Sequence, residues 1–298
     1  MVTPSARRAA VRHLASQEIA SERRGCQMVE VSRSYVRYEP RPRAEDGTLR
    51  ATIRTLARRH KRFGYRRIAD LLRRKGIEVN TKRVHRIWKA EGLNLPARRP
   101  RRRRRGSRGE VLHRAEKPNH VWSYDFMEDR TERGGRLRIL TVLDEYTRES
   151  LAIRVERSFG SQKVIETLDR LVAQRGAPDH IRSDNGPEFV ARAVQEWIGA
   201  RGCRTIFINP GSPWENPYIE SFNGKFRDEC LNMEVFASGK EAQMIVEAWR
   251  KDYNTYRPHS SLGYLTPAEF ADRSGSSSRA TPSFRFQNES TRALTLTP

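Results

Sequence analysis

The hydrophobic pattern of this 298-residue chain changes at Asn119, and this change constrains the possible folds more than any other feature. Beyond Asn119, three short apolar runs predict strands, with the pair Gly134-Gly135 as a hairpin turn between the first two. Helices and strands then alternate, which predicts an α/β fold with a mixed sheet flanked by helices. The predicted strands are 121–126, 137–143, 151–155, 180–183 and 204–208, and the predicted helices are 162–174, 188–200, 217–231 and 240–253.

Before Asn119 the periodicity is helical, so we expect an all-α region ahead of the sheet. Its last helix, 81–91, is predicted from a cap at Asn80 and a stop at Gly92. One face of this helix is apolar, and the rest is basic. A short turn followed by such a helix is the helix-turn-helix arrangement that enters a DNA major groove, and the alternative is an ordinary solvated helix. The predicted DNA contacts on it are Lys82, Arg83, Arg86 and Lys89.

Pattern and composition together divide the chain into five segments. The division is a basic N-terminal region at 1–48, a helix-turn-helix DNA-binding domain at 49–96, an arginine-rich linker at 97–118, the sheet-bearing domain at 119–272 and a flexible tail at 273–298. The first segment fits either a small helix-turn-helix, with Ser32 capping a short helix, or a frayed basic arm. In the linker, Arg101, Arg102 and Arg103 are predicted to contact DNA phosphates, and a solvated tether is the alternative.

Charge is distributed very unevenly along the chain, which carries a formal net charge of +22. Residues 1–110 hold 32 basic and 10 acidic side chains, whereas the remainder holds 26 of each. This asymmetry predicts a module that binds a polyanion, attached to a neutral body; ribosomal or membrane-surface binding would give the same charge. Three cysteines without CxxC spacing argue against a disulfide framework or a zinc site, and no apolar run has the length of a membrane span. We therefore expect a cytoplasmic protein without a membrane partner.

Three carboxylates occupy positions that suggest chemistry. Asp125 lies within an otherwise apolar strand, where a carboxylate is costly unless it is paired or bound to a cation. Asp184 directly follows a predicted strand, at a sheet end where ligands are commonly presented. Glu220 falls in the first turns of a helix that Asn216 can cap and Pro217 can open.

The helix around Glu220 separates its residues onto two faces. Helical spacing places Ile219, Phe222, Phe226 and Cys230 together as an apolar face. A neighbouring face carries Glu220, Asn223, Gly224 and Arg227 at i, i+3, i+4 and i+7. This second face predicts a metal ligand, Glu220, supported by two groups that contact DNA, Asn223 and Arg227.

These motifs together resemble the DDE catalytic core of retroviral integrases and of the second-frame (OrfB-type) transposases of bacterial insertion sequences. The resemblance rests on Asp125 in a strand, on Ser-Asp-Asn-Gly-Pro-Glu-Phe at 183–189 and on Asn-Pro-Tyr-Ile-Glu-Ser-Phe-Asn-Gly-Lys at 216–225. Thirty-five residues separate Asp184 from Glu220, the spacing of the DD35E group. Residues 253–264 and Thr266-Pro267 resemble the block that follows this core. No counterpart of the integrase His-His-Cys-Cys domain is found, which favours the transposase branch.

The resemblance implies a ribonuclease-H-like catalytic domain at 119–272 in which Asp125, Asp184 and Glu220 converge as catalytic and metal-binding residues. It implies two Mg²⁺ ions, with Mn²⁺ able to substitute, and a polynucleotidyl transferase that cuts element ends and joins them to target DNA through a 3′-hydroxyl. It also implies a homo-multimer on DNA, in a nucleoid-associated setting, and in many relatives an upstream-frame partner protein. The alternatives are a DNA-binding regulator and a nuclease that does not join strands.

Five further side chains near these motifs are assigned secondary roles. Asn185 and Glu188 are predicted to support Asp184 or contact DNA. Asp144 and Glu145 are interpreted as surface charges of a turn. His259 could suggest a general base, but a site with two metals needs none, so we predict a structural role for it.

Overall fold

The computed structural model describes residues 3–38, 46–95, 114–183, 192–208 and 216–275, which fall into two compact units, Met1–Leu56 and Ala57–Pro298. The first contains α1 (Pro4–Ser16), α2 (Glu22–Met28) and α3 (Arg33–Arg37). The side chain of Ser32 accepts a hydrogen bond from the backbone of Tyr35 and caps α3, as predicted.

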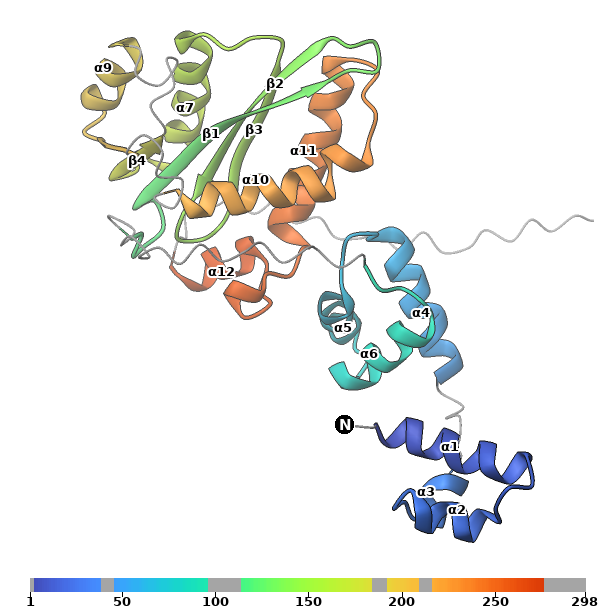
Figure 1. The fold of residues 1–298 in the computed structure, drawn as a ribbon. Coiled ribbons are helices and arrows are strands. Elements are labelled where there is room, and N and C mark those ends of the chain that lie inside the picture. The colour runs from blue at the N-terminus through green and yellow to red at the C-terminus, as the bar shows by residue number, and fades with distance from the viewer. Residues whose placement is uncertain (1–2, 39–45, 96–113, 184–191, 209–215, 276–298) are drawn as a thin grey trace, which may run out of the picture. The chain divides into compact units, whose positions relative to one another are not determined.

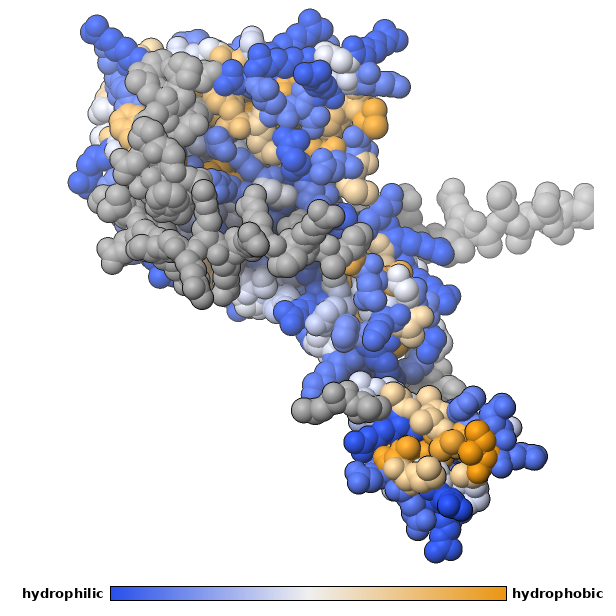
Figure 2. Space-filling model, viewed as in Figure 1, coloured by the Kyte–Doolittle hydropathy of each residue, from blue (hydrophilic) through white to orange (hydrophobic). Residues whose placement is uncertain are grey.

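The first unit has a small core. Val11, Cys26 and Val36 are buried at its centre, one from each helix. Ile19 and Met28 remain exposed, and Figure 2 shows apolar side chains gathered on the surface of this unit. Such short helices bury too little apolar surface to cover all of their hydrophobic side chains.

Three helices follow in the chain: α4 (Asp46–Arg59), α5 (Tyr65–Arg74) and α6 (Thr81–Ala90). The start of α6 is the one predicted, because the Asn80 side chain accepts a hydrogen bond of 2.8 Å from the backbone of Lys82. Val84, Ile87 and Trp88 are buried, so the apolar face of α6 is also as predicted. That packing fixes the rotation of α6 about its axis and directs the basic side chains away from the core.

The second unit is built on a five-stranded sheet in the order β3-β2-β1-β4-β5. Its strands are β1 (Val121–Arg130), β2 (Arg136–Asp144), β3 (Ser150–Glu156), β4 (His180–Ser183) and β5 (Arg204–Phe207). The first three pair antiparallel, whereas β4 and β5 run parallel to β1, so the sheet is mixed as predicted. Gly134 lies in the predicted hairpin turn at φ 79°, a conformation that favours glycine. The first strand is four residues longer than predicted, because its polar end pairs with the start of β2.

Helices cover both faces of this sheet (Figure 1). On one face, α7 (Ser161–Arg175) and α9 (Arg192–Ala200) pack over Trp122 and Tyr124 of β1. On the other face, α10 (Pro217–Glu229) and α11 (Gly239–Thr255) pack over Met127 of β1. Side chains alternate along a strand, so Asp125 lies on the same face as Met127, toward α10.

A 3₁₀ turn, η2 (Leu231–Met233), separates α10 from α11, and a second, η3 (Ser260–Leu262), follows α11. Next comes the helix α12 (Pro267–Arg273), which the periodicity did not predict. Its signal was local, since Thr266 and Glu269 form a reciprocal capping box around Pro267. Within the described part of the chain, no helix is both long and apolar enough to cross a membrane.

Candidate active site

Asp125 is half-buried in the middle of β1, and both of its carboxylate oxygens are engaged. One accepts a hydrogen bond of 2.7 Å from the backbone of Phe126, and the other accepts 2.9 Å from the amide of Asn223 on α10. Thr141, directly opposite on β2, donates to the carbonyl of Asp125 and to the side-chain oxygen of Asn223. Strand register and one helix therefore fix the position of this carboxylate.

Glu220 lies one helical turn before Asn223 on α10, and its side chain is exposed. The apolar face predicted for this helix is buried, with Ile219, Phe222 and Phe226 each no more than 1% exposed. Because that burial fixes the helix rotation, the face that carries Glu220 and Asn223 lies next to Asp125. The predicted cap differs in one respect: Asn216 occupies the N-cap position, but its side chain makes no capping hydrogen bond.

Asp184, with its neighbours Asn185 and Glu188, lies outside the described residues. The strand that ends at the preceding residue, β4, runs parallel to β1, with Ser123 opposite Arg182. Among the residues that the structure describes, no three His, Cys, Asp or Glu side chains gather as a metal site, and the predicted set includes Asp184. Convergence of all three carboxylates stays a prediction.

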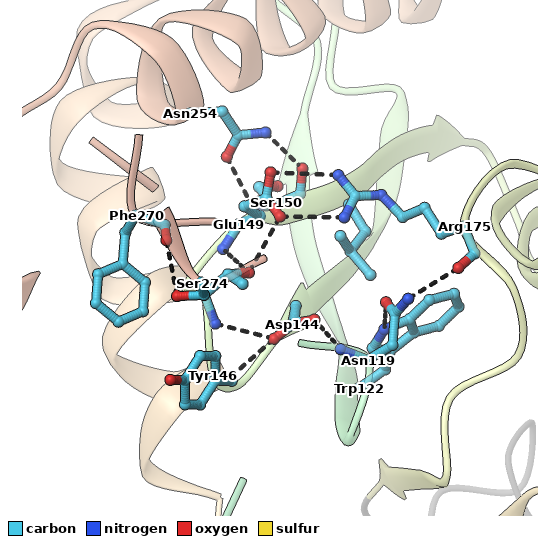
Figure 3. Close-up of polar contacts among 12 residues, drawn as sticks. Asn119, Trp122, Asp144, Tyr146, Glu149, Ser150, Arg175, Asn254, Phe270 and Ser274 are labelled. Atoms are coloured by element: carbon cyan, nitrogen blue, oxygen red, sulfur yellow. Dashed lines mark hydrogen bonds and ion pairs between the residues drawn. The ribbon is translucent and has the colours of Figure 1, made fainter. Parts of the chain in front are cut away.

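The interpretation of Asp144 and Glu145 as surface charges is wrong, because both are buried, at 0% and 1% exposure. Asp144 accepts three backbone hydrogen bonds, from Asn119, Tyr146 and Thr147, which hold the turn after β2 (Figure 3). Burial raises the pKa of the Asp144 carboxyl above its usual range. The turn requires this carboxylate as a structural acceptor, so it points inward.

Two buried ion pairs join this turn to its surroundings. Glu145 accepts a hydrogen bond of 2.8 Å from Arg182 of β4, and both side chains are almost fully buried. Burial raises the pKa of Glu145 to about 7 even beside this arginine. Glu149 pairs with Arg175 of α7 at 3.0 Å (Figure 3). The first pair ties the turn to β4 two residues before Asp184.

The block at 253–264 forms a second buried cluster, centred on Arg257 at the end of α11. Arg257 makes a two-pronged ion pair with Glu229 of α10, at 2.6 and 2.5 Å. Its remaining nitrogen lies 3.3 Å from Nε2 of His259, which therefore acts as an acceptor, and the His259 ring packs edge-on against Tyr253. Burial and the neighbouring arginines lower the pKa of His259 to about 2. These contacts support the structural role predicted for His259.

A buried neutral histidine makes stability depend on pH. Because the pKa of His259 is lower in the folded chain than in the unfolded chain, its contribution is complete above about pH 6.5 and is lost as the pH falls. Below pH 6.5, the unfolding free energy of the wild type should fall more steeply with decreasing pH than that of His259→Gln, which keeps an acceptor but cannot titrate. The two slopes should differ by up to about 1.4 kcal/mol per pH unit. Urea unfolding between pH 7.5 and 5 measures this, with the exposed His85→Gln as control. Parallel curves for wild type and His259→Gln would contradict the expectation.

The predicted DNA contacts differ in how the fold presents them. On α6, Lys82, Arg86 and Lys89 are exposed, whereas Arg83 is half-buried. Arg227 turns toward the end of β1 and donates to the carbonyl of Glu128 at 2.8 Å. The linker residues Arg101, Arg102 and Arg103 lie outside the described residues.

Sequence reasoning missed the partners that hold the site. Thr141 could be found only from the register of β1 and β2, since nothing in an apolar strand marks one threonine. Arg182 had a usable signal: a charged residue inside a short strand, the same anomaly that drew attention to Asp125. Glu229, which pairs with Arg257, lies beyond the motif face of α10 and gave no signal.

Comparison with known proteins identifies the family. Residues 115–213 and 201–267 match two family models described as integrase core domain, and residues 43–103 match an HTH-like domain. The chain is 42% identical over 270 residues to an uncharacterized 31.7 kDa protein of insertion element IS407 from Burkholderia multivorans, covering 89% of this chain and 95% of that protein. It is 30% identical over 224 residues to the transposase InsD of insertion element IS2 from Escherichia coli, covering 70% and 73%.

The chain belongs to the integrase-core transposases of insertion elements. It is thus a polynucleotidyl transferase of the DDE type that acts in DNA transposition, as the motifs predicted. Its mixed sheet with flanking helices is the ribonuclease-H-like integrase core, preceded by a helical region with an HTH-like domain. A chain in a solved structure of the simian T-cell lymphotropic virus intasome is also similar, with 17% identity, a TM-score of 0.46, and 83% of this chain and 80% of that chain covered.

Proposed function

We propose that this transposase binds the ends of its insertion element, cuts a DNA strand there and joins the freed 3′-hydroxyl to a target strand, using Asp125, Asp184 and Glu220. The observation that carries the proposal is the hydrogen bond of 2.9 Å between Asn223 and Asp125. Since Asn223 follows Glu220 by one turn on α10, this bond supports an approach of Glu220 to Asp125. The parallel pairing of β4 with β1 supports the same for Asp184, the next residue after β4.

The donor set fits hard divalent cations. Asp125, Asp184 and Glu220 offer carboxylate oxygens, which Mg²⁺ prefers, with Mn²⁺ able to substitute. The side chain of Glu220 is exposed, and Asn223 bonds the carboxylate of Asp125. When bound, two such cations would activate an attacking oxygen and stabilise a leaving oxygen at phosphorus.

The chemistry consists of two displacements at phosphorus. In the first, water attacks a phosphodiester at the element end, the bond from phosphorus to the 3′-oxygen breaks, and a 3′-hydroxyl is released. In the second, that hydroxyl attacks a target phosphodiester, losing its proton, and the target's own 3′-oxygen leaves with a proton. Each step replaces one oxygen on phosphorus by another, first by that of water and then by that of the 3′-hydroxyl, so neither an oxidant nor a covalent enzyme intermediate is needed.

Recognition of the element ends is assigned to α6. Its exposed Lys82, Arg86 and Lys89 would contact the major groove or its phosphates, with Arg83 supporting them. Arg101, Arg102 and Arg103 would follow the phosphate backbone, and Arg227 would lie near DNA beside the active site. The active form is proposed to be a homo-multimer on paired ends, associated with the nucleoid, either alone or with an upstream-frame partner.

Mapping of reaction products tests this function. The chain is incubated with Mg²⁺ and labelled duplexes of the DNA that flanks its own gene, and cut and joined strands are sequenced. We expect a cut at one defined phosphodiester per end and joined products that carry the freed 3′-hydroxyl. Cutting without joining would identify a nuclease on this fold. Specific binding without cutting would identify a DNA-binding regulator.

A further inference from the structure

Three arginines in the segment 62–74 form ion pairs with carboxylates of the second unit's C-terminal half. Arg67 pairs with Glu229 at 3.1 Å, and Arg74 makes a two-pronged pair with Glu269 at 2.7 and 2.9 Å. Arg62 pairs with Asp228. In every pair the arginine comes from the segment around α5, and the carboxylate comes from α10 or α12. These contacts hold α5 beside the end of the helix that carries Glu220.

A groove of about 650 Å³ runs between the two walls joined by these pairs. One wall is formed by Gly64, Tyr65 and Arg66 at the start of α5, and the other by Lys225 of α10 together with Tyr264. The groove therefore lies between α5, which packs against the helix proposed to contact bases, α6, and α10, which carries the proposed catalytic carboxylate Glu220.

Two cations of this groove form no ion pair with any carboxylate in the described part of the chain: Arg66 and Lys225. Arg66 is exposed and donates to the hydroxyl of Tyr65 at 3.3 Å. Lys225 is half-buried and donates to the hydroxyl of Ser221 at 2.9 Å, so its ammonium points back toward the residue that follows Glu220. The arginines that are paired hold the walls, which leaves these two cations to face the groove.

The surroundings of Lys225 carry surplus positive charge. Burial and the nearby Arg257, Arg67 and Arg148 lower the pKa of Lys225 to about 8, and Glu229 only partly opposes this effect. An anion in the groove would relieve this repulsion. The groove is open and lined by cations on both walls, which suits a continuous polyanion better than a small ion.

We propose that this groove binds the sugar–phosphate backbone of DNA between the helix-turn-helix and the active site, with Lys225 and Arg66 as phosphate contacts. The inference rests on the proposed function, because it takes the element end as the occupant. Bound there, the backbone would connect the bases read by α6 to the phosphodiester presented to Glu220.

The proposal is tested by measuring the affinity of the full-length chain for two DNA duplexes at several salt concentrations. One duplex is its own element end, and the other is a shuffled sequence. We expect Lys225→Gln and Arg66→Gln each to weaken binding to both duplexes roughly fivefold at about 0.15 M salt. Each should also make the negative slope of log K against log salt shallower by about 0.9. The matched controls Lys251→Gln and Arg170→Gln, which replace exposed cations of α11 and α7, should leave both values unchanged. Lys225→Arg should also bind as the wild type does.

Uncharged methylphosphonates in the DNA locate the contact. Wild type should lose affinity when a phosphate between the α6 site and the cut site is neutralised, whereas Lys225→Gln should be insensitive at that same phosphate. Unchanged affinity and slope in Lys225→Gln and Arg66→Gln would overturn the proposal, as would weaker binding with an unchanged slope, which indicates altered folding.

Failure of this inference is distinguishable from failure of the proposed function. If wild type cuts and joins strands but the groove variants bind DNA normally, only the groove assignment is wrong. If the groove variants lose affinity and slope while wild type cuts no strand, the groove stands as a DNA site and the cleavage proposal is overturned.

Discussion

Replacing any one of the three carboxylates by its amide, as Asp125→Asn, Asp184→Asn or Glu220→Gln, is expected to lower strand cutting and joining at least about a thousandfold. The amides keep the side-chain shape but remove the charge that would hold divalent cations. A thousandfold loss of rate corresponds to about 4 kcal/mol of lost transition-state stabilisation, since each 1.4 kcal/mol changes the rate about tenfold. DNA affinity in the absence of metal should stay close to that of wild type.

A strand-mapping time course with Mg²⁺ measures this effect, and Mn²⁺ tests for partial rescue. Asp129→Asn is the matched control, because Asp129 lies on the same strand and, among the described residues, bonds its neighbour's backbone and, weakly, Arg227. Thermal unfolding of each variant separates lost chemistry from lost folding, which matters for Asp125 because it bonds Asn223. Wild-type turnover by any one variant would remove that residue from the site.

The second large effect concerns stability. Arg182→Met should lower the unfolding free energy by about 3–5 kcal/mol at pH 8, because it removes the partner that stabilises the buried charge of Glu145. Protonation of Glu145 removes that charge, and loss of the arginine raises the pKa of Glu145 further above about 7. The destabilisation should therefore be smaller at pH 5.5 than at pH 8.

Urea unfolding at the two pH values measures this effect. The double variant Arg182→Met with Glu145→Gln should recover part of the loss at pH 8, since neither position of the pair then carries a buried charge. Arg201→Met, which breaks the exposed pair with Asp169, is the control and should cost no more than about 1 kcal/mol. An equal cost for the buried and the exposed pair would show that Glu145 is solvated in the folded chain.

Much of the local structure followed directly from local sequence patterns. Hydrophobic periodicity located the strands and most of the helices, and capping residues such as Asn80 and Ser32 fixed where helices begin. The same periodicity identified Ile219, Phe222 and Phe226 as the buried face of α10. These features depend on neighbours three or four residues away, so one short stretch of sequence specifies them.

The turn after β2 shows where local reasoning failed. Asp144 and Glu145 have the composition of a solvated turn, and yet both are buried. Their partners, Asn119 and Arg182, come from elements distant in sequence, and only the assembled sheet brings them within hydrogen-bond reach. A buried charge is tolerated where such partners exist, and their presence cannot be read from the turn itself.

The sequence by itself determined the mixed sheet, the family and the order of the three carboxylates, because periodicity and motif spacing are properties of the linear chain. The tertiary structure decided which side chains hold the site. Register between β1 and β2 sets Thr141 opposite Asp125, and packing of α10 brings Asn223 to that carboxylate. The tertiary structure also brings Arg67 and Glu229 together as an ion pair, although they lie 162 positions apart in the sequence. Lys225 lines the groove beside this pair. Such contacts arise only when folding brings distant segments together, since no local rule relates residues so far apart.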